Sequence, residues 1–76
     1  MCTSIRIDMR KTGYNISRLR KEKGIPVKQI QETMGFNTPQ AIYKWIRGET
    51  LPSLDNMFVL SMLFQITIEE IVILEK

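Results

Sequence analysis

Three glycines divide much of this chain into segments that suit only short helices. Gly24, Gly35 and Gly48 each follow a stretch in which apolar residues recur at helical spacing. A glycine directly after such a stretch is typical of a helix end, because it adopts the left-handed conformation of a C-terminal cap without steric cost. The chain is therefore expected to form a bundle of short helices.

The starts of the first three helices are predicted from capping residues. Thr12 precedes the first amphipathic stretch, and Pro26 stands where the first turn of the second helix would lie. Thr38 and Pro39 combine a side-chain N-cap with a proline at the first helical position, where its missing N–H is tolerated.

Two further helices are predicted in the second half of the chain. Ser53 is suited to cap the fourth helix, and Thr67 with Glu70 has the spacing of a capping box for the fifth. The predicted helices cover about 13–23, 26–34, 39–47, 54–64 and 68–73, within one domain of residues 12–74.

The N-terminal residues 1–11 have a different pattern. Ile5, Ile7 and Met9 alternate with charged residues, which is the periodicity of a strand. The sequence leaves open whether this segment is a strand or a disordered basic arm.

Size and composition exclude several classes of protein. A chain of 76 residues, 43% hydrophobic and 25% charged, is an ordinary small globular domain with no room for a deep catalytic cleft. Cys2 is the only cysteine and histidine is absent, so one chain can build neither a disulfide framework nor a thiolate or imidazole metal site. We expect no cofactor and no enzymatic activity.

The same features favour a location in the reducing cytoplasm, at the nucleoid. No stretch approaches the roughly 18 consecutive apolar residues of a membrane span, and the charged N-terminus is unlike a secretory signal. We therefore expect a protein that is neither exported nor membrane-anchored.

Charge is distributed unevenly along the chain. Residues 1–48 hold ten Lys and Arg against three acidic residues, whereas residues 49–76 hold one Lys against five acidic residues. Such a separation is expected if one face of the protein meets an anionic polymer.

The arrangement of the second and third helices indicates that this anionic polymer is DNA. Two short helices joined by a tight turn containing Gly35 form a helix-turn-helix, whose second helix enters the DNA major groove. Helical spacing places Ala41, Ile42 and Trp45 on the inner side of this helix. The remaining arc carries polar side chains that can bond base edges and phosphates, namely Gln40, Tyr43, Lys44 and Arg47.

Residues 16–71 resemble the Cro/phage-repressor (Xre) family of helix-turn-helix DNA-binding domains. The motifs "LRKEKG", "AIYKWIRGE", "LPS" and "TIEEI" occur in the family's order and spacing. The resemblance implies an all-α, five-helix bundle like that of lambda repressor, which binds operator DNA as a dimer. It also implies a transcriptional regulator, most often a repressor.

The family's functional positions correspond to particular residues of this chain. The resemblance implies base contacts from Gln40 and Lys44, with Thr38 and Tyr43 beside them, and backbone contacts from Arg20 and Arg47. We also expect backbone contacts from Lys28 and Asn37.

Departures from the family pattern affect this transfer, among them the two that follow. The turn "GFNTP" is one residue longer than usual, and Ile46 replaces a glutamate that often pairs with an arginine of the first helix. Without this glutamate, we expect Arg20 either to bind a DNA phosphate or to pair with Glu49.

Apolar residues in the fourth helix and the C-terminal tail suggest that two copies of the chain associate. Val59 and Met62 make the fourth helix apolar nearly all round, and Ile73 and Leu74 continue an apolar tail. We expect a homodimer through these residues. The alternative is that the N-terminal apolar residues fold back over this patch within one chain and pair with residues 71–74 as a strand.

A second function is also compatible with this apolar surface. An antitoxin-like or adaptor protein would bind another protein through the fourth helix and tail, with autoregulatory DNA binding.

Overall fold

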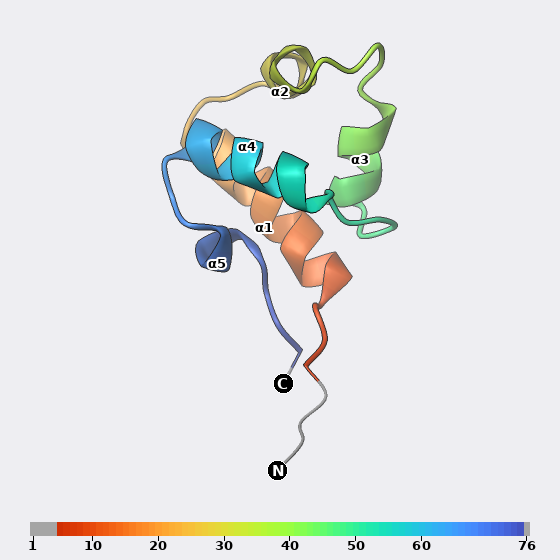
Figure 1. The fold of residues 1–76 in the computed structure, drawn as a ribbon, viewed down its shortest axis with the longest axis vertical. Helices are drawn as coiled ribbons and strands as arrows, with labels where there is room; N and C mark the ends of the chain where they lie inside the picture. Colours follow the sequence, from red (N-terminus) through yellow and green to blue (C-terminus); the bar gives the residue numbers. More distant parts are fainter. Residues whose placement is uncertain (1–4, 76) are drawn as a thin grey trace.

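The computed structural model describes residues 5–75 and shows five helices around one core. They are α1 (Met9–Glu22), α2 (Val27–Met34), α3 (Gln40–Ile46), α4 (Leu54–Phe64) and α5 (Ile68–Ile71). Helix α4 crosses in front of α1, α2 lies at the top and is seen end-on, α3 lies to the right and α5 to the left (Figure 1). The all-α, five-helix prediction is confirmed.

The core is built from side chains of every helix. The fully buried ones include Ile16, Ile30, Ile42, Leu60 and Ile71, one from each helix in turn. Trp45 is 4% exposed, and Ala41 is packed against this cluster, so the inner side of α3 is the one expected from helical spacing.

Helix α1 starts earlier than the sequence pattern predicts. It begins at Met9 rather than near residue 13, because the Asp8 carboxylate accepts a hydrogen bond from the backbone N–H of Lys11 at 2.9 Å and caps the helix. Thr12, expected as the cap, is buried inside the helix. The first four residues of the predicted arm lie outside the described part of the chain.

Helix α5 ends earlier than expected. Its start is as predicted: the Glu70 carboxylate accepts from the backbone N–H of Thr67 at 3.0 Å, which also lowers the pKa of Glu70. The helix stops at Ile71 rather than residue 73, and Val72 is already extended. The tail is extended because it pairs with another part of the chain.

The tail pairs with the N-terminal segment. Ile7 and Leu74 form an antiparallel bridge, the Asp8 N–H donates to the Ile73 carbonyl at 2.7 Å, and the Glu75 N–H donates to the Arg6 carbonyl at 2.8 Å. The N-terminal segment therefore folds back within one chain and pairs with the tail through backbone hydrogen bonds. This is the arrangement named above as the alternative to a dimer. Both described ends lie at the bottom of the molecule, away from α2 (Figure 1).

Two polar side chains of α1 fix the tail in place. Thr12 Oγ1 accepts from the Ile73 N–H at 2.9 Å, and Asn15 Nδ2 donates to the carbonyls of Glu70 and Ile71 at 2.8 and 2.9 Å. Both side chains are buried, and these bonds satisfy backbone groups that the short helix α5 leaves without internal partners.

Gly13 allows α1 to approach α3 at backbone distance. A Cβ at this position would overlap the carbonyl oxygens of Trp45 and Ile46. Because both obstacles are backbone atoms, neither can move aside as a flexible side chain would. The orientation of α3 therefore depends on the missing side chain of Gly13.

We expect Gly13→Ala to lower the free energy of unfolding by about 1–3 kcal/mol, because the added methyl group forces α1 and α3 apart. Urea unfolding followed by circular dichroism measures this. Ser17→Ala, one turn further along α1, is the control and should change stability by less than about 0.5 kcal/mol. Equal stability of Gly13→Ala and the parent would contradict the close approach of the two backbones.

Candidate nucleic-acid interface

The turn between α2 and α3 is held by backbone and side-chain bonds. Gly35 adopts the left-handed conformation (φ 76°) and ends α2. The Phe36 N–H donates to the Gln31 carbonyl at 3.0 Å, and Gln31 Nε2 donates back to the Phe36 carbonyl at 3.3 Å. The Phe36 ring contacts Trp45 edge-on, with centroids 5.9 Å apart. The turn is thus tied both to α2 and to the buried side of α3.

The start of α3 lies one residue later than the sequence predicts. Thr38 Oγ1 accepts from the Gln40 N–H at 3.4 Å, and the Pro39 carbonyl accepts from the Tyr43 N–H at 3.1 Å. Pro39 is therefore the N-cap rather than the first helical residue, and Thr38, predicted as the cap, precedes it. As at the first helical position, the missing N–H of Pro39 leaves no helical bond unmade. Asn37 and Thr38 are exposed just before the helix.

The outer side of α3 brings the predicted polar residues together. Gln40, Tyr43, Lys44 and Arg47 are all exposed, whereas Ile42 and Trp45 hold the opposite side in the core. Tyr43 is 44% exposed, although its ring is large and apolar enough to be buried. The helix thus presents donors, acceptors and an aromatic ring on one face, as major-groove readout requires.

Arg47 has a partner that sequence reasoning missed. Its Nε lies 2.6 Å from Oε2 of Glu49, and both side chains are about half exposed. This hydrogen bond raises the pKa of Arg47 and lowers the pKa of Glu49. The expected alternative pair of Glu49 with Arg20 is wrong, because Gly48 turns the chain so that Glu49 faces Arg47 instead. The two residues are two apart and lie past the end of a helix, not at the i, i+3 or i, i+4 spacing of helical ion pairs, so the helical pattern gave no signal.

Arg20 lies at the other end of the helix-turn-helix. Its Nη1 donates to the Ile25 carbonyl at 3.3 Å, while its buried Nε has no hydrogen-bond partner among residues 5–75. It lines a shallow hollow with Lys21 and the segment leading into α2. Helix α2 starts after Pro26 without a side-chain cap, and Lys28 is exposed in its first turn. The cationic side chains of Arg20 and Lys28 therefore lie near the start of α2, where backbone N–H groups have no side-chain cap and can bind an anion.

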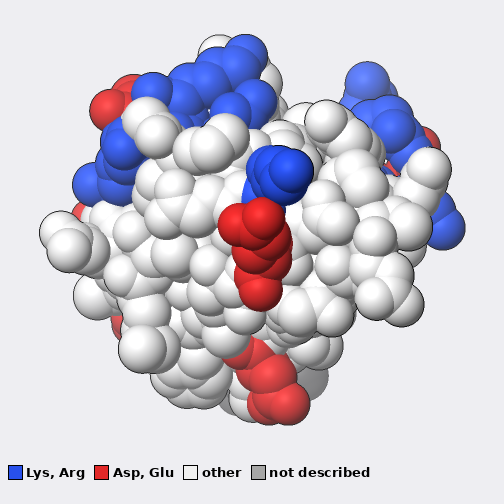
Figure 2. Space-filling model, turned by 90° about the horizontal axis from the view of Figure 1, so that it is seen from above, with Lys and Arg blue, Asp and Glu red and all other residues white. Residues whose placement is uncertain are grey.

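The basic side chains form two groups on the surface. Seen from the α2 end, Lys and Arg gather at two places toward the same edge of the molecule, and one further basic side chain lies between them beside acidic ones (Figure 2). Basic side chains gathered on one side of the molecule are suited to contacts with DNA phosphates.

Other kinds of site are not found in the described part of the chain. Residues 5–75 contain no group of three or more metal-ligating side chains. Every helix there is too short or too polar to cross a membrane.

These features together define a helix-turn-helix DNA-binding protein. A family model of helix-turn-helix domains matches residues 16–71, and the chain belongs to this family, in its Cro/C1-type, Xre-like branch. The protein is a DNA-binding transcriptional regulator, and the antitoxin-like or adaptor alternative is not favoured.

A solved structure shares the fold. The restriction-modification controller protein C.AhdI from Aeromonas hydrophila superposes with a TM-score of 0.73 at 25% sequence identity, over 84% of this chain and 96% of that one. No curated protein matches the chain.

We expect Glu49→Gln to strengthen binding to any DNA sequence, because it frees Arg47 for a phosphate. The salt slope of binding should steepen by about one contact, while the loss of an exposed ion pair costs less than about 1 kcal/mol of stability. Fluorescence anisotropy over a salt series measures both affinity and slope.

Glu75→Gln is the matched control, since it removes the same charge from the exposed tail. An equal gain in both variants would mean that general charge, and not the release of Arg47, causes the effect.

Proposed function

We propose that this regulator recognises a specific operator with α3 in the major groove and represses transcription by occupying it. The observation that carries the proposal is the outer side of α3, where Gln40, Tyr43, Lys44 and Arg47 are exposed together. Gln40 and Lys44 are suited to base edges, adenine and guanine respectively, and Tyr43 to a thymine methyl or a phosphate. Thr38 lies beside Gln40 at the start of the helix and joins the base contacts.

Backbone contacts are proposed for residues at both ends of the motif. Lys28 and Arg20 flank the uncapped start of α2, where open backbone donors favour a phosphate. Asn37 precedes α3, and Arg47 follows it. These contacts supply affinity and salt dependence, and they set the register of α3 without reading sequence.

The similarity to a controller protein supports a regulatory role for a domain of this size. The structural match spans 96% of the controller chain. The shared fold therefore makes up nearly all of that controller chain.

We also propose that the protein binds its operator as a homodimer. Helix α4 carries Leu54, Phe58 and Met62 one turn apart, and they are 69%, 55% and 76% exposed. A continuous apolar stripe of this kind on a small domain is typical of an interaction surface. Val59 is half-buried beside the stripe.

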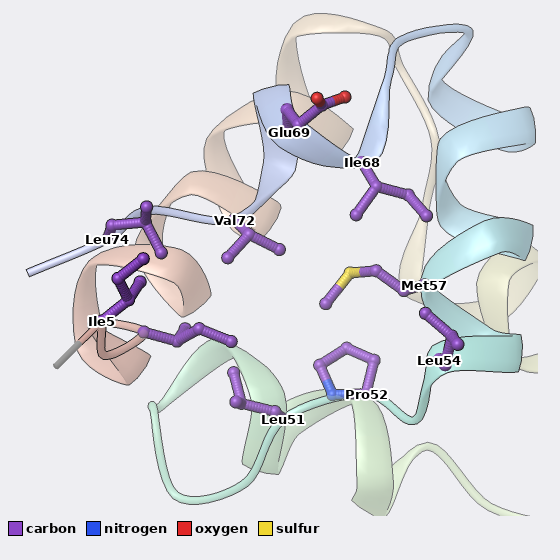
Figure 3. A pocket seen from close by; sticks show the side chains of 10 residues that line it. Ile5, Leu51, Pro52, Leu54, Met57, Ile68, Glu69, Val72 and Leu74 are labelled. Carbon is purple, nitrogen blue, oxygen red and sulfur yellow. The ribbon is translucent and has the colours of Figure 1, made fainter. Parts of the chain in front are cut away.

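An apolar groove adjoins this stripe (Figure 3). It has a volume of about 580 Å³ and lies between the start of α4, α5 and the paired terminal segments. Ile5, Ile7 and Leu74 form one wall of it. The terminal segments thus form an edge of the apolar groove and do not cover it. A second copy of the chain can therefore still cover it. Leu74 is 50% exposed and Ile73 is half-buried behind it.

We expect Lys44→Ala or Gln40→Ala to reduce the preference for operator over random DNA by about 1–3 kcal/mol, because each removes a base contact. The operator is first selected from random duplexes with the parent protein, and the variants are then titrated on both DNAs. The fold should be unchanged, since both side chains are exposed. An equal loss on operator and random DNA would exclude base reading by that residue.

We expect Met62→Glu to weaken dimerisation at least tenfold, about 1.4 kcal/mol, because it places a charge in an apolar interface. Sedimentation velocity at micromolar concentration measures this, with Thr33→Glu on the exposed side of α2 as the control. A parent protein that sediments only as an 8.9 kDa monomer would contradict the dimer.

A further inference from the structure

The exposed side of α1 combines basic residues with an aromatic ring. Arg10, Lys11, Arg18 and Lys21 lie on this side and all are exposed. Tyr14 stands among them with 71% of its surface exposed, one of the highest values for a large side chain in residues 5–75. Neither the core nor the helix-turn-helix accounts for these residues.

Helix stability does not explain the cations at the start of α1. The first turn contains no acidic residue, and it holds Arg10 and Lys11 near the positive end of the helix dipole, where cations are unfavourable. Lys21 lies in the last turn, where the dipole favours a cation, and Arg18 pairs with Glu22.

Internal ion pairs leave most of these cations available. Within residues 5–75 the ion pairs are Arg18 with Glu22, at 2.6 Å, and Arg47 with Glu49. Arg10, Lys11 and Lys21 take part in neither. An exposed group of cations of which most have no ion-pair partner in residues 5–75 suits an external polyanion.

The start of the basic side of α1 lies beside the end of α3. Gly13 packs against the backbone of Trp45 and Ile46. Gly48 lies so close to Arg10 that a Cβ on Gly48 would come within 2.8 Å of the Arg10 Cα. Arg10 therefore adjoins Arg47, the last residue of the α3 interface, and Tyr14 and Lys21 follow at intervals of four and seven residues along α1.

We propose that this side of α1, formed by Arg10, Tyr14, Arg18 and Lys21 with Lys11 beside them, binds the phosphate backbone of duplex DNA flanking the site that α3 reads. The proposal rests on the proposed function of α3. The cations pair with phosphate oxygens, and the Tyr14 hydroxyl donates a hydrogen bond to one of them. These contacts add affinity and salt dependence and do not distinguish sequences.

The test compares the double variant Arg10→Gln/Lys21→Gln with the parent protein on two lengths of duplex. Glutamine keeps the β- and γ-carbons of Arg10 that lie against Gly48, so the fold is retained, as circular dichroism checks. One duplex ends at the selected operator, and the other carries about one further helical turn, ~10 base pairs, on each side. On the long duplex the salt slope should fall by about 2, one unit for each phosphate that the variant no longer neutralises. On the short duplex the variant should match the parent.

Arg6→Gln/Lys23→Gln is the control for net charge. It removes the same charge from the terminal segment and from the end of α1 beside Glu70, away from the basic side. An unchanged slope for the α1 variant on the long duplex, or the same decrease in the control, would overturn the proposal.

The outcome for α1 can be separated from the outcome for α3. On long random duplexes, the α1 variant should show the same decrease in salt slope as on the long operator duplex. This decrease remains measurable even if Lys44→Ala shows that α3 reads no bases. An α1 variant that instead lowers the preference for operator over random DNA would contradict a backbone role.

Discussion

The contact between α1 and α3 at Gly13 is the constraint on which the rest of the molecule depends. It brings two backbones together where a side chain would normally separate them, and it leaves Trp45 in the core with its ring against Phe36. The contact at Gly13 thereby links α1 to the inner side of α3. Through the contact of Phe36 with Trp45, it also links α1 to the turn between α2 and α3. Because α3 is only seven residues long, its own hydrogen bonds cannot keep it rigid, and its orientation is imposed by packing.

The opposite end of the molecule is held by polar bonds instead. Thr12 and Asn15, both buried in α1, bond the backbone of α5 and the tail. A helix of four residues has nearly all its backbone groups at its ends, so it needs such partners. The fold therefore uses apolar packing where the recognition helix must be oriented, and buried hydrogen bonds where the chain ends must be brought together.

Helices α2, α3 and α4 could be predicted from the sequence because their limits are local. Gly35, Thr38 with Pro39, and Ser53 each act on the residues next to them. The separation of Gln40 and Lys44 from Ile42 and Trp45 likewise follows from helical spacing alone. These predictions needed no knowledge of the rest of the chain.

The features that were missed depend on residues distant in sequence or outside any periodic element. The alternation of Ile5, Ile7 and Met9 obscured Asp8 as the cap of α1, and the tail is extended only because it meets Ile7. The Arg47–Glu49 pair forms across a turn that no repeating pattern describes.

The pairing of residues 6–8 with residues 73–75 also affects how the protein folds. These bonds join the two ends of the described chain, so they close a larger loop than any contact between neighbouring helices. Contacts of such long sequence separation form slowly, and the helical core can assemble without them. We expect the terminal pair to form last and to open first, so that the amides of Asp8 and Glu75 exchange with solvent sooner than those of α1. The groove then loses one wall in a small fraction of molecules that are otherwise folded.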